Sequence, residues 1–160
     1  MANDMDETRS TLNDLIETCK DSQQGFHTAA GKLKDHEIHT LFNQLYLQRS
    51  EFAGELQAEV TRLGGDPATS GSTLGAIHRG WAGLKTALAA DTDFAILEEA
   101  DKAEDAAVKN YIDALRRSLP SDLESIVSRQ FHEIQKARKS IHELLERHPS
   151  TTDLPMAGLR

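Results

Sequence analysis

The chain has 160 residues and a formal net charge of −8, and only 5% of its residues are aromatic. The acidic balance argues against a nucleic-acid-binding protein and against docking on anionic lipid, because both functions need a basic surface. No apolar run approaches the roughly 20 residues of a membrane helix, and the N-terminus lacks the apolar segment of a signal peptide. We therefore expect a cytoplasmic, all-helical protein with one domain over residues 11–148, between flexible ends at residues 1–10 and 149–160.

Two long amphipathic helices are predicted in the first half of the chain. From about Leu12 to Leu33, apolar residues recur at three- and four-residue steps, which places them on one helix face. Ser10 or Thr11 is suited to cap the start of this helix. The second helix is predicted from about His36 to Leu63. Gly64-Gly65-Asp66-Pro67 ends it, because glycine accepts the left-handed cap conformation and proline cannot continue a helix.

The segment from Ala68 to Ala90 differs from its neighbours. It begins with threonine, serine and glycine, which is a loop composition, and a helical period then follows around Trp81. This pattern predicts a short helix within a long crossover. The string His78-Arg79-Gly80-Trp81 holds the one tryptophan of the chain. Its large apolar side chain could cover the bundle of its own chain or a partner subunit.

Two further long helices are predicted, from about Thr92 to Ser118 and from Asp122 to about Arg147. Ser121 and Glu124 have the spacing of a capping box at the start of the last helix. Short connections make the first and second helices, and the third and fourth, antiparallel neighbours. Two helical hairpins joined by one long crossover correspond to a ferritin-like four-helix bundle.

Polar residues interrupt the apolar stripe of every long helix near its middle. Antiparallel packing would bring these interruptions to about the same level of the bundle. The interruptions are Gln23 with His27 beside it, Gln48, Asp101 with Glu104, and Gln130 with Glu133 at its margin.

A buried carboxylate such as Glu104 needs a metal ion, an ionic partner or hydrogen bonds, because its desolvation is costly. Di-iron bundles supply a Glu from two helices and a Glu-x-x-His pair from the other two. Here the corresponding pairs read Gln48-x-x-Glu51 and Gln130-x-x-Glu133, so both Glu-x-x-His pairs are missing. The candidate ligands for iron or another divalent metal are Glu104, Glu133, Glu51, His27 and Asp101. The alternative is a hydrogen-bonded layer in which the three glutamines satisfy the acids. If Glu104 is an uncompensated acid, Glu104→Gln should leave stability unchanged or raise it.

Four segments resemble one bacterial family of ferritin-like four-helix bundles whose domain is labelled as of unknown function. The resemblance covers about Leu12 to His148. The segments are Leu12-Asn13-Asp14-Leu15-Ile16-Glu17, Arg62-Leu63-Gly64-Gly65-Asp66-Pro67, Gly71-Ser72 through His78-Arg79-Gly80-Trp81, and Glu104-Asp105-Ala106-Ala107.

The resemblance implies a link with bacterial stress or stationary-phase conditions and frequent dimer formation. The missing ligand histidines and the apolar crossover helix favour a non-enzymatic protein that acts in stress adaptation through protein interaction or dimerisation. A homodimer is expected through a helix pair or through the crossover helix. The wider superfamily handles iron and oxygen, and members of this family often lack a full ligand set. The alternative, favoured by the acids at core positions of the third and fourth helices, is a divalent metal protein with a degenerate di-metal site in the bundle core.

Overall fold

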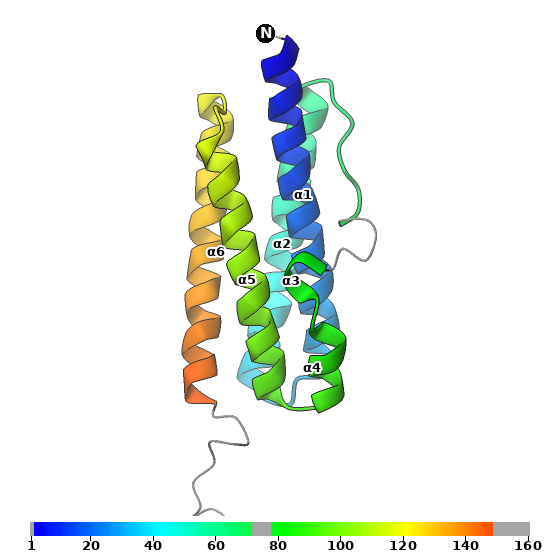
Figure 1. Ribbon diagram of the computed structural model, residues 1–160, viewed down its shortest axis with the longest axis vertical. Helices are drawn as coiled ribbons and strands as arrows, with labels where there is room; N and C mark the ends of the chain where they lie inside the picture. The colour runs from blue at the N-terminus through cyan, green and yellow to red at the C-terminus, as the bar shows by residue number, and fades with distance from the viewer. Residues whose placement is uncertain (1, 72–77, 149–160) are drawn as a thin grey trace, which may run out of the picture.

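The computed structural model describes residues 2–71 and 78–148. This part of the chain is helical and holds no strand (Figure 1). It confirms the predicted all-helical class. The four long helices are α1 (Ala2–Ala30), α2 (His36–Arg62), α5 (Asp93–Arg116) and α6 (Ser121–Arg147), and the two short ones are α3 (His78–Trp81) and α4 (Leu84–Ala90).

The long helices form two antiparallel hairpins, α1–α2 and α5–α6, which lie side by side in Figure 1. Helix α5 begins beside the loop that joins α1 to α2. The backbone N–H groups of Lys34 and Asp35 donate to the Asp93 carboxylate at 2.9 and 2.8 Å. Helix α2 ends at the opposite end of the bundle, so the connection from α2 to α5 leads from one end of the bundle to the other. The ferritin-like connectivity expected from the sequence is therefore present.

Helix α1 begins at Ala2, ten residues before the predicted start near Leu12. Residues 2–10 contain neither proline nor glycine, so nothing in the sequence stops the helix there. Thr11 is 2% exposed inside the helix and is not its cap. The Arg9 guanidinium donates to the Leu63 carbonyl at 2.8 Å, which ties this first part of α1 to the end of α2. The predicted C-terminal end, residues 149–160, lies outside the described residues.

The start of α6 also differs from the prediction. Pro120 is its N-cap residue and makes no side-chain capping bond, and Ser121 is the first residue of the helix. The predicted capping box between Ser121 and Glu124 is therefore not formed. Proline fixes the backbone angle at the cap position, and the Glu124 N–H bonds to the Pro120 carbonyl at 2.9 Å.

The crossover holds two short helices where the sequence predicted one. Both pack on α5, and both also contact α1. Trp81 is 2% exposed and meets Phe26 edge-to-face at 5.1 Å between ring centroids. A Cβ added to Gly25 would lie 2.2 Å from the Trp81 ring, so only glycine lets the indole lie against α1 at this point. Trp81 thus covers the bundle of its own chain.

The apolar core is divided into two clusters along the bundle. One includes Leu12, Leu56 and Val127, and the other includes Phe42 and Ile141. Two buried charged residues, Arg49 on α2 and Glu104 on α5, lie between the clusters, and they form the centre of the candidate site. None of the helices in the described part is long and apolar enough to span a membrane.

Candidate functional site

The centre of the bundle is occupied by a buried ion pair between α2 and α5. The two terminal nitrogens of Arg49 donate to the two carboxylate oxygens of Glu104 at 2.6 and 2.5 Å. Both side chains are 0% exposed. Two parallel bonds of this kind match the planar guanidinium to the planar carboxylate, so the pair is both charge-balanced and geometrically fixed.

Further contacts satisfy the rest of the Arg49 guanidinium. Its Nε donates to Gln48 Oε1 at 3.1 Å, and its carbon lies 5.5 Å from the centre of the Phe26 ring. Burial alone would lower the pKa of Arg49, but the charge and hydrogen bonds of Glu104 outweigh burial and raise this pKa. Arg49 is therefore a permanent cation inside the bundle.

A second polar group joins all four long helices next to the ion pair. Gln130 Nε2 donates to the Phe52 carbonyl at 3.3 Å and to Glu55 Oε1 at 2.8 Å, so its Oε1 faces Tyr111. The Tyr111 hydroxyl must therefore donate to Gln130 Oε1, at 2.7 Å. The Tyr111 oxygen then accepts from the Cys19 thiol, whose sulfur is 3.1 Å away. The two acceptors on α2, the Phe52 carbonyl and Glu55 Oε1, thus orient the whole chain of bonds.

Both titratable groups of this chain of bonds are held in their neutral forms. Burial raises the pKa of the Cys19 thiol from 9.0 to about 11. Burial, together with the neighbouring Cys19, raises the pKa of Tyr111 well above 10. A reactive cysteine needs a thiolate at neutral pH, and this environment opposes one. Cys19 and Tyr111 are thus neutral hydrogen-bonding groups of the core.

Glu104 and Gln130 are fully buried at the mid-bundle level, where the sequence predicted them. The other predicted polar residues lie at the margin of the layer or outside it. Gln23, Gln48 and Asp101 are half-buried, Glu133 is half-buried with Lys136 at 3.5 Å, Glu51 is exposed, and His27 is exposed with its ring 4.9 Å from that of Tyr46.

The structure does not bring the candidate metal ligands into one cluster. Within residues 2–71 and 78–148, no group of three or more His, Cys, Asp or Glu side chains is arranged to hold a metal ion. Asp101 faces His142, whose Nδ1 is 3.5 Å from Asp101 Oδ1. Glu104, the best-placed candidate, already has both oxygens bonded to Arg49.

The sequence analysis did not identify Arg49 as a core residue, although its spacing from apolar residues of the same helix indicated it. Arg49 follows Leu45 by four residues and precedes Phe52 by three, so it shares their helix face. A buried carboxylate such as Glu104 is stabilised by a cation at the same level of the bundle, and Arg49 is that cation. Glu99 of α5 is another buried acid, at 6% exposed. Its Oε2 accepts from the Gly83 N–H at 2.7 Å, so it holds the start of α4.

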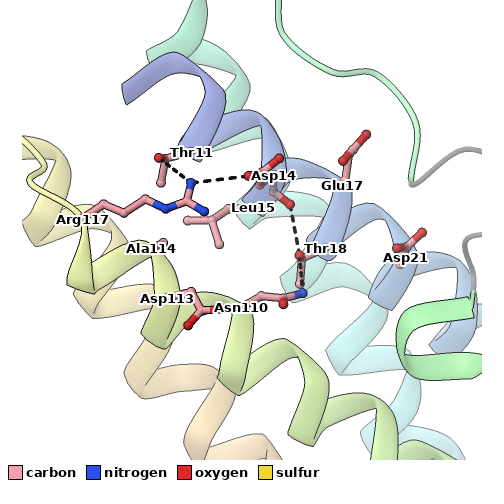
Figure 2. Close-up of a pocket in the computed structure, with 10 residues that line it drawn as sticks. All are labelled: Thr11, Asp14, Leu15, Glu17, Thr18, Asp21, Asn110, Asp113, Ala114 and Arg117. Carbon is pink, nitrogen blue, oxygen red and sulfur yellow. Dashed lines mark hydrogen bonds and ion pairs between the residues drawn. The ribbon is translucent and has the colours of Figure 1, made fainter. Parts of the chain in front are cut away.

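A cleft of about 250 Å³ between α1 and α5 is the second candidate site (Figure 2). At one end, Arg117 donates to Thr11 Oγ1 at 2.9 Å and lies 3.5 Å from Asp14 Oδ2. Figure 2 shows Glu17 and Asp21 pointing away from Asp113. The carboxylates of the cleft therefore do not converge on one point. Its lining is Thr11, Asp14, Leu15, Glu17, Thr18, Asp21, Asn110, Asp113, Ala114 and Arg117.

Comparison with known proteins gives a family and a fold. The family model described as "Domain of unknown function (DUF2383)" matches residues 7–117. Among solved structures, a mutant of Dps1 from Mycobacterium smegmatis is similar, with a TM-score of 0.74 and 14% sequence identity. The alignment covers 91% of this chain and 99% of that chain. No curated protein sequence matches. The structural match supports the ferritin-like bundle and carries no activity with it.

Proposed function

The chain belongs to the DUF2383 family, and from that premise we propose that it is a non-enzymatic ferritin-like bundle that acts through protein interaction. The setting that its family resemblance implies is bacterial stress adaptation. One observation carries the non-enzymatic part of the proposal: Arg49 occupies the centre of the bundle and bonds both oxygens of Glu104.

The chemistry of the central layer supports this proposal. A di-iron bundle needs several inward carboxylates and two histidines around vacant space for the metals. Here the one carboxylate at the centre is neutralised by a guanidinium that is itself fully buried. A divalent cation at this position would have to displace Arg49 or lie beside its positive charge. Either arrangement is electrostatically unfavourable.

The alternative function, divalent metal binding, is kept as a second prediction because Glu104 lies at the predicted level of the bundle. Metal analysis of protein purified without chelator, followed by ferrous titration under air, separates the two functions. We expect sub-stoichiometric metal and an iron-oxidation rate equal to that of buffer. About one or two irons per chain, lost on Glu104→Ala, would establish the alternative and refute the proposal.

The Glu104→Ala variant leaves the Arg49 charge unpaired in the core and could unfold the protein for that reason alone. A double variant, Arg49→Met with Glu104→Leu, removes the same carboxylate without leaving a buried charge. Glu124→Ala is the matched control, because it removes an exposed carboxylate of α6 that is not among the candidate ligands. If the double variant retains the metal content and iron oxidation of the wild type, the centre of the bundle is not the metal site.

A further inference from the structure

The two halves of α6 are packed differently. The first half contributes large side chains to the apolar cluster that includes Leu12, and two more pack against that cluster. The buried ones are Leu123, Val127 and Ile134, and the partly buried ones are Ile126 and Phe131. In the second half, residues 135–147, the buried side chains are Ala137, Ile141 and Leu144, which belong to the cluster that includes Phe42. One of these three is an alanine, so the second half buries less apolar area than the first.

Hydrogen bonds fix α6 at the boundary between its halves. Gln130 is fully buried, accepts from the Tyr111 hydroxyl at 2.7 Å and donates to Glu55 Oε1 at 2.8 Å. These bonds tie the middle of α6 to α5 and to α2. The first half can therefore keep its place without the second.

The second half is tied to its neighbours by exposed ion pairs. Arg138 lies 3.0 Å from Asp105 of α5, and Arg147 lies 3.6 Å from Glu37 of α2. Each of these four side chains is at least 36% exposed. Ion pairs in such surroundings contribute little to stability, because water competes for both charges.

Packing around the second half is incomplete at two places. A groove of about 550 Å³ lies between it and α2, with Leu41 and Ser140 among the residues that line it. On the side of α5, Asp101 Oδ1 is buried and accepts no hydrogen bond from the described residues. His142 Nδ1, at 3.5 Å, is beyond the ordinary length of such a bond. A buried oxygen without a partner destabilises the closed arrangement, and water would bond to it on opening.

We propose that residues 135–147 of α6 open as a unit, while residues 121–134 and the other long helices stay folded. Opening removes α6 from the cluster that includes Phe42 and Ile96, and so uncovers apolar side chains of α2 and α5. This proposal goes beyond the interaction role proposed above, because it adds an apolar surface that exists in the open form alone.

The test is amide hydrogen exchange of the full chain, measured by NMR in the presence of low concentrations of urea. We expect the amides of residues 137–147 to exchange at one common rate, about tenfold or more above the rate of residues 125–131. Opening of one helix half exposes less surface than global unfolding, so the common rate should depend less on urea.

Two matched variants separate the halves, because Ile134 and Ile141 are both buried on α6 but belong to different clusters. Ile134→Val should speed exchange of residues 125–131 about fivefold and leave residues 137–147 unchanged. Ile141→Val should speed exchange in both halves, since its contacts are lost in local opening and in global unfolding alike.

Three results would overturn the proposal. Equal exchange rates in the two halves would show that the second half does not open by itself. Rates that fall steadily from Arg147 towards the middle of α6 would show ordinary fraying of a helix end. An Ile134→Val variant that speeds both halves equally would show that they open together. Failure of the proposed function is a separate result, because it would appear as Glu104-dependent iron binding.

Discussion

The ion pair between Arg49 and Glu104 makes a quantitative prediction about stability. Both side chains are 0% exposed, so removing one leaves the other charge buried without its partner. Loss of one member of such a pair costs about 3–5 kcal/mol. Glu104→Gln is the most informative change, because it keeps the shape of the side chain. The amide presents one oxygen and one NH2 group to two guanidinium donors, so at least one Arg49 bond is lost.

The expected size of the effect follows from the burial. For a domain of this size, 3–5 kcal/mol lowers Tm by roughly 10 °C. The double variant Arg49→Met with Glu104→Leu removes both charges and fills the space with apolar atoms. It should be as stable as the wild type or more stable by about 1–4 kcal/mol. The single and double variants therefore move stability in different directions.

Urea denaturation of the wild type, Glu104→Gln, Arg49→Met, Glu104→Leu and the double variant measures the coupling between the two positions. Arg62→Ala is the control, because Arg62 pairs with Asp122 at 3.1 Å with both side chains exposed, and its urea midpoint should not change. A Glu104→Gln variant as stable as the wild type would refute the reasoning. That outcome is the one expected of an uncompensated acid, and it would contradict the stabilising pair between Arg49 and Glu104.

Two further predictions concern the crossover and the buried thiol. Gly25→Ala places a Cβ against the Trp81 ring, so it should lower the free energy of unfolding by about 1–3 kcal/mol and shift tryptophan emission to the red. The control Gly54→Ala in α2, where a Cβ meets nothing within 4 Å, should be neutral or stabilising. Equal effects of the two variants would contradict the packing of Trp81. Because folding raises the pKa of Cys19 from 9.0 to about 11, its contribution to stability is complete below pH 9 and is lost as pH rises to 11. A thiol reagent at pH 8 should accordingly modify Cys19 only in urea, and rapid modification of the native protein would show that the thiol is accessible.

The fold was predictable because its determinants are repeated along the chain. Each long helix carries many apolar residues at helical spacing, so errors at single positions do not alter the result. Helix ends depend on one or two residues each and were predicted less well. Asp35 caps α2 through a bond from the Ile38 N–H at 3.1 Å, whereas the expected cap at Thr11 lies inside a longer helix. Local sequence permits a cap, and packing decides whether it forms.

The central layer was only partly predictable, because a buried polar group has several physical solutions. The period placed Glu104 and Gln130 in the core, and both are there. The same period allowed a metal, amides or an arginine to satisfy Glu104. Distinguishing these solutions needs the relative rotation of α2 and α5, which brings Arg49 rather than Gln48 to face Glu104. Gln48 and Arg49 lie about 100° apart around α2, and which of them faces Glu104 decides whether the site carries a net charge.

The position of Arg49 has a consequence for where the activity of this protein is to be sought. A bundle that holds metal depends on an external cation for the charge balance of its core. Here Arg49 supplies that cation from the chain itself, and Gln130, Tyr111 and Cys19 complete the layer with neutral bonds. The charge balance of the core therefore does not depend on a bound metal, and the stability of the fold should not change when metal is added or removed. If the proposed interaction role holds, it is to be sought on the surface of the bundle and not in its centre.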